Sequence, residues 1–397
     1  MKYLNLILAI MFGCSNQGKD SALENDSGSE DIVEAIVDAD SDGVAAEDDC
    51  DDLDPDLLAR SEDSDCDGIE NSIDDCPDDA LNDLDSDGIC GAEDPICNGD
   101  FEIGGLDSAE DILLLSQCSE IEGYLMISEI TVRSMVGLEK LQVIGGDLSF
   151  VGNSSLTSLE GLENLISIGG SLQIEDNTAM VGVNALESLT VVSGQVLIQN
   201  NPQLAHVDGL TALKTVGGYL KLVDNYLLHV NGLSALETIG GVLEIQSDRM
   251  ITYDGLSNLT AIGENLLIRN NERLQNITGL SSVQSIGGYI NISQNESLFH
   301  IDGLAGLQSI GGSINLSDNL ILQNLYGLIG LTSIPGNLSI LRNTTLSNIE
   351  GLESLTLIDS DLTISSNSAL CQSDIDTFIL GVAVGGTVST TGNALCD

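Results

Sequence analysis

Three runs of alternating aspartates near the start of the chain have the spacing of a metal-binding loop. Each run is followed directly by glycine and has a further aspartate at its twelfth position. Calcium takes about six to eight oxygen ligands, and a glycine at the sixth position lets the loop wrap round the ion. The sequence therefore predicts three Ca²⁺ sites, with Ca²⁺ as the cofactor. The predicted ligands are Asp38, Asp40, Asp42 and Asp49; Asp63, Asp65, Asp67 and Asp74; and Asp83, Asp85, Asp87 and Asp94.

Other interpretations of this acidic stretch fit its spacing less well. Magnesium prefers a tight octahedron that keeps several waters, and zinc would require histidine or free thiolates. The stretch contains no histidine. A solvated, disordered acidic linker is the remaining alternative, because acidic composition alone is enough to produce one.

The same stretch resembles two known kinds of calcium-binding segment. The middle run continues through Asn71, Asp74, Cys76 and Pro77, and there it resembles a thrombospondin type 3 repeat. The first run is also similar to the aspartate-rich metal-binding motifs of secreted bacterial proteins. The resemblance implies a module over residues 38–96 that is held by calcium and cysteines instead of an apolar core, preceded by an acidic linker over residues 15–37.

The charge of the chain is divided unevenly between this module and the rest. The 397 residues include 63 acidic and 11 basic ones, for a formal charge of −52. Residues 20–100 hold 31 of the acids and a single base, Arg60. So acidic a protein would repel phosphate backbones and anionic membrane surfaces, which argues against nucleic acid as a partner. Only the later segment has enough leucine, isoleucine and valine to bury a large core.

The N-terminus has the features of an export signal. Lys2 precedes an apolar run from Leu4 to Phe12, which is too short to span a bilayer, and Gly13-Cys14 follows. This arrangement resembles a bacterial lipoprotein signal over residues 1–14, which implies a lipid on Cys14. An ordinary signal peptide with an incidental cysteine is the alternative. We expect an N-terminal lipid to be the only membrane anchor.

The cysteines agree with export into an oxidising compartment. Apart from Cys14, eight remain, and an even number in an exported chain predicts up to four disulfides. The connectivity of Cys50, Cys66, Cys76 and Cys90 stays open. No cysteine lies between residues 119 and 370, so that region must be stabilised by packing.

A repeat of 23 or 24 residues fills the rest of the chain. A leucine recurs at 138, 162, 186, 210, 233, 256, 280, 304, 328 and 352. The segment after each glycine pair alternates with period two, as in Leu172-Gln173-Ile174, which predicts a short strand with one buried face. So short a unit cannot bury its own apolar side, so the units must stack in parallel register as a solenoid. Helical repeats are disfavoured because no unit keeps a helical period.

Two polar columns recur within this repeat. One is asparagine in nearly every copy and aspartate once, and it predicts an internal, structural amide ladder: Asn153, Asn177, Asn201, Asn225, Asp248, Asn271, Asn295, Asn319, Asn343 and Asn367. The other contains His206, His229 and His300, and we expect His206 and His229 to be neighbours on adjacent rungs. Because serine, threonine and asparagine fill the same column elsewhere, we interpret it as a solvated edge.

The repeat as a whole resembles the receptor L-domain, a leucine-rich-repeat-like fold. The pattern Gly-Leu-x-x-Leu-x-x-Ile-Gly-Gly-x-Leu-x-Ile-x-x-Asn carries the resemblance over residues 97–397. It implies a mainly β protein, a right-handed parallel β-helix of about eleven rungs, built as one extended helix or as two fused L-domains. The caps of that family imply disulfide cysteines at Cys97 and Cys118 and at Cys371 and Cys396.

The outward strand positions of the solenoid form the natural surface for a ligand. The middle rungs hold its aromatic, basic and exposed apolar residues, and we define the predicted patch as Tyr219, Lys221, Leu267, Arg269 and Tyr289. We expect a non-enzymatic binding or adhesion protein, lipid-anchored in the cell envelope, at the outer membrane or cell surface of a Gram-negative bacterium. Its partner would be an extracellular protein or glycan. The alternatives are a passive spacer or coat protein and a polysaccharide-acting β-helix enzyme.

Overall fold

The computed structural model describes residues 59, 61, 64, 71–72 and 96–396. The chain divides into two compact units, residues 1–68 and 69–397. Three residues of the first unit are described, and none of them lies in a helix or an extended sheet. Every helix and sheet reported below lies within residues 96–396 of the second unit.

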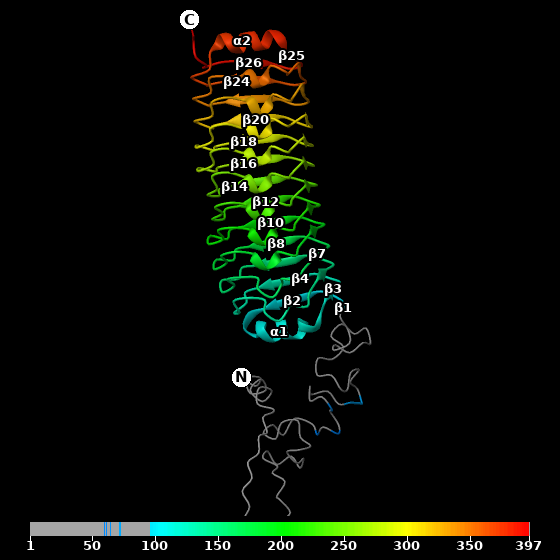
Figure 1. Ribbon diagram of the computed structural model, residues 1–397. Coiled ribbons are helices and arrows are strands. Elements are labelled where there is room, and N and C mark those ends of the chain that lie inside the picture. The colour runs from blue at the N-terminus through cyan, green and yellow to red at the C-terminus, as the bar shows by residue number, and fades with distance from the viewer. Residues whose placement is uncertain (1–58, 60, 62–63, 65–70, 73–95, 397) are drawn as a thin grey trace, which may run out of the picture. The chain divides into compact units, whose positions relative to one another are not determined.

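Successive rungs stack into a solenoid in which all paired strands are parallel (Figure 1). The long sheet runs along the stack in the order β2-β4-β6-β8-β10-β12-β14-β16-β18-β20-β22-β24-β26. Its strands are β2 (Phe101–Gly104), β4 (Leu125–Ser128), β6 (Leu148–Val151), β8 (Leu172–Glu175), β10 (Val196–Gln199), β12 (Leu220–Val223), β14 (Leu243–Gln246), β16 (Leu266–Arg269), β18 (Ile290–Ser293), β20 (Ile314–Ser317), β22 (Leu338–Leu341), β24 (Leu362–Ser365) and β26 (Val388–Ser389).

Two further sheets of two-residue strands follow the same stack. The first contains β1 (Ile96–Cys97), β3 (Glu120–Ile121), β5 (Val143–Ile144), β7 (Ser167–Ile168), β9 (Val191–Val192), β11 (Thr215–Val216), β13 (Thr238–Ile239), β15 (Ala261–Ile262), β17 (Ser285–Ile286) and β19 (Ser309–Ile310). The second contains β21 (Ser333–Ile334), β23 (Leu357–Ile358) and β25 (Ala383–Val384).

Short 3₁₀ helices complete the rungs and include the recurring leucine in eight of them. They are η4 (Asn184–Leu186), η5 (Asp208–Leu210), η6 (Asn231–Leu233), η7 (Asp254–Leu256), η8 (Thr278–Leu280), η9 (Asp302–Leu304), η10 (Tyr326–Leu328) and η11 (Glu350–Leu352). Two more, η2 (Gly105–Asp107) and η3 (Leu115–Gln117), flank α1. The residue before the leucine is mostly glycine because it packs against backbone: a Cβ on Gly303 would overlap the carbonyl of Ile277.

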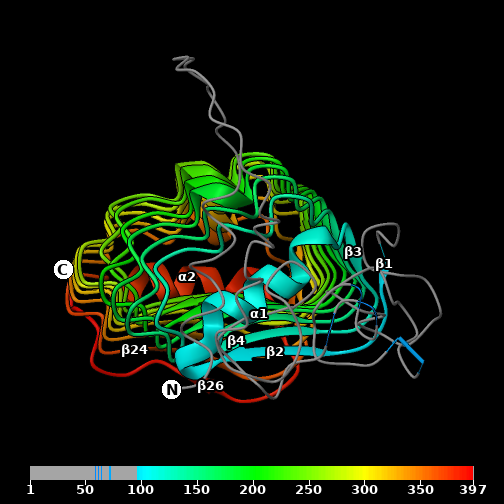
Figure 2. The ribbon, with the colours of Figure 1, turned by 90° about the horizontal axis from the view of Figure 1, so that it is seen from below.

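Each end of the solenoid carries one α-helix and one disulfide. Helix α1 (Ser108–Leu114) lies across the first rungs in the end-on view of Figure 2, and α2 (Gln372–Gly381) lies at the other end (Figure 1). Cys97 is bonded to Cys118 and Cys371 to Cys396, as the cap resemblance implied. Within residues 96–396, no helix is long and apolar enough to cross a membrane.

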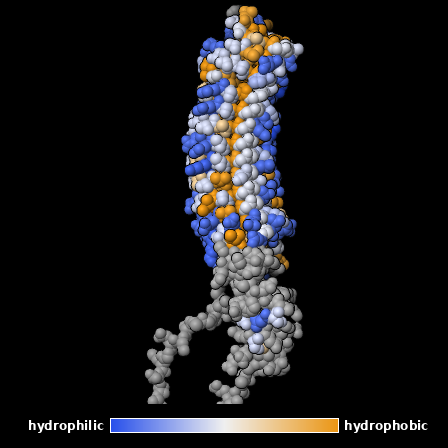
Figure 3. Space-filling view, turned by 90° about the vertical axis from the view of Figure 1, so that its right-hand side faces the viewer, coloured by the Kyte–Doolittle hydropathy of each residue, from blue (hydrophilic) through white to orange (hydrophobic). Residues whose placement is uncertain are grey.

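The core is a set of apolar columns along the inside of the stack. Alternation buries the first and third residues of every long-sheet strand from β4 to β24, as at Leu172 and Ile174, which are fully buried. This confirms the predicted parallel, mainly β solenoid. The long sheet contains thirteen strands, more than the expected eleven rungs, because the cap segments pair at both ends as β2 and β26 without the leucine repeat. On the face in Figure 3, a narrow hydrophobic band follows the stack between hydrophilic residues.

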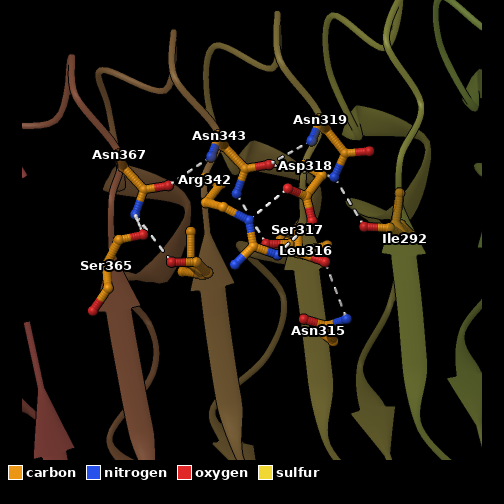
Figure 4. A network of polar contacts seen from close by, with 11 residues as sticks. Ile292, Asn315, Leu316, Ser317, Asp318, Asn319, Arg342, Asn343, Ser365 and Asn367 are labelled. Carbon is orange, nitrogen blue, oxygen red and sulfur yellow. Dashed lines mark hydrogen bonds and ion pairs between the residues drawn. The ribbon is translucent and has the colours of Figure 1, made fainter. Parts of the chain in front are cut away.

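The asparagine column forms the predicted ladder (Figure 4). The Oδ1 of Asn343 accepts a hydrogen bond from the backbone N–H of Asn319 at 3.0 Å, and its Nδ2 donates to the Leu316 carbonyl at 2.9 Å. Nearly every neighbour repeats this pattern, and Asn393 ends the ladder by accepting from the Asn367 N–H. These side chains are buried, so the ladder is structural and satisfies backbone groups that water cannot reach.

A column of left-handed residues aims the ladder inward. The residue before each ladder side chain has a positive φ in most rungs, as at Asp224 (53°), Ser247 (58°) and Asn270 (56°). This conformation ends the strand and turns the chain, so the next side chain points beneath the turn. This conformation was not predicted from the sequence, because asparagine, aspartate, glutamine, serine and arginine all occur at this position.

Candidate binding surface

The predicted calcium ligands from Asp38 to Asp94, and the predicted lipidation site Cys14, lie outside the described residues. The calcium sites therefore stay a prediction from the sequence. Within the part of the chain that the structure describes, no group of three or more histidine, cysteine, aspartate or glutamate side chains is arranged to hold a metal ion.

The predicted patch contains an ion-pair cluster centred on Glu244. Strand register places Glu244 between Lys221 and Leu267 in one row of the long sheet. Its Oε2 lies 3.4 Å from the Lys221 Nζ, and its Oε1 is bonded to Arg269 Nη2. Glu244 is only 7% exposed, so it compensates both cations within the sheet surface. The basic residues expected to face a ligand are therefore partly engaged by the protein itself.

The other members of the predicted patch differ in exposure. The Lys221 ammonium lies 4.7 Å from the centre of the Tyr219 ring, which joins Tyr219 to the cluster. Tyr289 is 42% exposed. Leu267, however, is only 8% exposed, because Glu244 and Asn291 flank it in the same row. It therefore does not offer the exposed apolar surface that we expected at this position.

A cavity of about 910 Å³ lies where the chain leaves the strands of four successive rungs. Ser247, Asn270 and Gln294 line it from the left-handed column. Side chains of both signs also line it: Asp248, Arg249, Glu272, Arg273, Glu296 and Asp318. The cavity and the predicted patch are adjacent in sequence, because Arg269 of the patch directly precedes Asn270 of the cavity.

Apart from Asp248, the charged residues of this cavity fall into two groups. Arg249 stacks on Tyr226, with its guanidinium carbon 4.0 Å from the ring centre, and donates to the Tyr226 hydroxyl at 2.9 Å. Asp318 is held by Arg342. In contrast, Glu272, Arg273 and Glu296 form no hydrogen bond or ion pair through their side chains within residues 96–396. They remain available to an incoming ligand.

This cavity was not predicted from the sequence, because the predicted patch was drawn from the strands and the positions directly beside them. The residues that line it belong to the turns, where the repeat has no fixed pattern. One signal was available in the sequence. Arg249, Arg269 and Arg273 fall within 25 residues, although the whole chain has only 11 basic residues.

The histidines occupy the positions that the repeat predicts. His206 and His229 pair as a parallel bridge, and their rings stack with centroids 6.0 Å apart and planes 9° from parallel. Asp208 lies between them. Its Oδ2 is 3.5 Å from the His206 Nδ1, and its Oδ1 is 3.5 Å from the His229 Nδ1. Asp302 has the same relation to His300, at 3.4 Å. The three imidazoles are partly exposed, whereas the Nδ1 atoms that face the aspartates are buried.

Comparisons with known proteins give little beyond the fold described above. No protein-family model matches the chain, and no curated protein matches it. Among solved structures, the chain is similar to a leucine-rich-repeat protein of Leptospira interrogans, at 16% identity and a TM-score of 0.29. The match covers 69% of this chain and 91% of the other. A superposition that weak carries no argument, so the parallel stack and the ladder themselves are what identify the solenoid.

Proposed function

We propose that this protein is a non-enzymatic binding or adhesion protein of the cell envelope. In this proposal a lipid on Cys14 anchors it at the outer membrane or cell surface of a Gram-negative bacterium. The aspartate loops over residues 38–96 form a calcium-binding stalk, and the solenoid binds an extracellular protein or glycan. The export signal, the spacing of the aspartates and the leucine-rich-repeat-like solenoid support these three parts respectively.

The cavity over residues 247–320 is the observation that carries the binding role. It joins four rungs and holds Glu272, Arg273 and Glu296, which have no side-chain partner within residues 96–396. Unpaired charged groups bring no stability to the solenoid, but they suit a partner that supplies their hydrogen bonds. An arginine fork takes a carboxylate in two parallel bonds, and glutamates accept from hydroxyl or ammonium groups. The expected ligand is therefore polar, with acidic groups and hydroxyls or amines.

Array screening of the mature full-length protein tests this proposal. We expect binding to a subset of glycans or extracellular proteins, and loss of at least about tenfold in affinity in the double variant Arg273→Ala/Glu296→Gln. Lys214→Ala is the matched control, because Lys214 forms no side-chain bond among the described residues and does not line the cavity. A second variant, Tyr219→Ala/Lys221→Ala, measures the contribution of the predicted patch.

The other outcomes separate the alternatives. Binding that is unchanged in both double variants would place the ligand elsewhere and contradict this assignment. An absence of binding across both arrays would favour a passive spacer or coat protein. Hydrolysis of an arrayed polymer would favour a polysaccharide-acting enzyme.

A further inference from the structure

Asp248 is the one carboxyl group in the ladder from Asn153 to Asn393. On either side of it, the amide nitrogen donates to a strand carbonyl of the preceding rung: Asn225 to Ile198 at 2.8 Å, and Asn271 to Ile245 at 3.0 Å. By the same relation, an asparagine at position 248 would donate to the carbonyl of Leu222. Where the ladder needs a donor, an ionised aspartate has only acceptors.

The hydrogen bonds of Asp248 show this mismatch directly. Its Oδ1 accepts from the backbone N–H of Leu227 at 3.3 Å, whereas Asn225 and Asn271 each accept from the N–H of the preceding ladder residue. Its Oδ2 is buried and has no hydrogen-bond partner among the described residues. The Oδ1 of Asn271 is also close, because it accepts from the Asp248 N–H at 3.2 Å. An ionised Asp248 would therefore bring negative charge toward oxygen atoms in a site that is only 3% exposed.

Within residues 96–396, no cation forms an ion pair with Asp248. On the preceding rung, Asp224 repels it. On its own rung, the buried Tyr253 hydroxyl has no partner, and Arg249 is turned toward Tyr226. On the following rung, Arg269 is bonded to Glu244.

The remaining charged groups nearby, Glu272 and Arg273, also belong to the following rung and line the cavity. Burial is the largest influence on the acid and raises the pKa of Asp248 from 3.8 to about 7, against the opposing effect of hydrogen bonds from Leu227 and Asn225. Burial also raises the pKa of Tyr253 well above its usual value, and the charge of Asp248 adds to this.

We propose that Asp248 is a protonation switch within the ladder: as a neutral acid it completes the ladder, and as a carboxylate it breaks the ladder at that rung. The neutral form supplies an O–H donor where asparagine would supply N–H. Because Ser247, Asp248 and Arg249 line the cavity, the broken rung lies at the wall of that cavity. Ionisation would loosen this wall in the middle of the stack.

The direction of the effect follows from the two protonation states. Between about pH 4 and 7 the folded protein holds a proton on Asp248 that the unfolded chain has released. Stability must therefore fall as pH rises through this window, by about tenfold in the folding equilibrium per pH unit. Below the window both states are protonated at this site, and above it both are ionised.

The test compares the full-length protein with Asp248→Asn in denaturant unfolding from pH 4 to pH 8. We expect the two to be similar at the acidic end, and Asp248→Asn to be increasingly more stable as pH rises. Hydrogen exchange gives a local readout: at pH 8 the amide of Leu227 should exchange at least about tenfold faster in the wild type than in Asp248→Asn, with no such difference at pH 4.

Asn295→Asp is the reciprocal variant, because Asn295 makes the same ladder bonds two rungs later. It should add a second fall in stability between pH 4 and 8, and folding at pH 4 but not at pH 8 would also support the proposal. An identical pH dependence in wild type and Asp248→Asn, or equal Leu227 exchange at pH 8, would overturn it. If Asn295→Asp folds at neither pH, the comparison of wild type with Asp248→Asn decides by itself.

Discussion

Arg342 binds Asp318 of the preceding rung with both ends of its guanidinium, through Nε to Oδ1 at 2.6 Å and Nη2 to Oδ2 at 2.7 Å (Figure 4). The pair lies on the surface, with Arg342 56% exposed. Asp318 also lines the cavity, so the pair fixes one end of that wall.

Replacing Arg342 with alanine should cost less than about 1 kcal/mol at neutral pH, because solvent screens an exposed pair. Arg342 lowers the pKa of Asp318. The stabilisation is therefore present above the ordinary aspartate value of 3.8 and is lost as pH falls through the lowered pKa. Unfolding of wild type and Arg342→Ala should converge in acid, and a difference that grows on acidification would contradict this account.

The ladder should be sensitive to truncation at a buried position. Asn319→Ala removes the acceptor for the Asn295 N–H and the donor to the Ile292 carbonyl. Leaving such groups unpaired in the interior costs about 1–3 kcal/mol, measurable in urea unfolding. Asn348→Ala is the control, since Asn348 bonds to the Glu350 N–H at an exposed turn. An equal loss in the free energy of unfolding for Asn319→Ala and Asn348→Ala would show that burial of the asparagine does not determine the loss.

The glycine before the recurring leucine should not accept a side chain. In Gly303→Ala the new Cβ would overlap the Ile277 carbonyl, and backbone cannot move aside cheaply. We expect a loss of about 3 kcal/mol or more in thermal or urea unfolding. Gly381→Ala provides the comparison, because no atom lies within 4 Å of a Cβ added at the end of α2. Tolerance of Gly303→Ala would mean that the rungs are less closely stacked than described.

Calcium binding by the aspartate loops is tested by calorimetry on the mature chain. Millimolar calcium should give a heat of binding that a chelator abolishes, with affinities of about 10⁻⁴ to 10⁻³ M. The triple variant Asp63→Asn/Asp65→Asn/Asp67→Asn should lose about one third of the sites. Asp374→Asn in α2 should lose none. No heat from millimolar calcium would remove the stalk from the proposed function.

Lipid attachment is tested by Cys14→Ser expressed with its signal. The wild type should partition into detergent and incorporate a labelled fatty acid, because diacyl attachment gives stable anchoring. The variant should lose both properties while the solenoid stays folded by circular dichroism. Labelling that persists in Cys14→Ser would place any lipid elsewhere.

The sequence was sufficient for the backbone of the solenoid and its internal columns. Leu172 and Ile174 could be placed inside because alternation and a 24-residue period act together. Asn319 could be assigned to a ladder because the same side chain recurs at the same phase. The cap disulfides were identified by resemblance alone. The apolar alternation and the ladder position recur at a fixed phase from rung to rung, so one rung predicts the next.

Contacts that differ from rung to rung required the tertiary structure. Glu244 neutralises Lys221 and Arg269 only because three strands come into register. Leu267 is covered by its neighbours in the row, and the cavity forms from turn residues that follow no template. The environment of Asp248 likewise depends on the rungs on either side of it. The repeat thus determines where a side chain points, whereas its burial and partners depend on residues 23 or 24 positions away that only the stacked chain brings together.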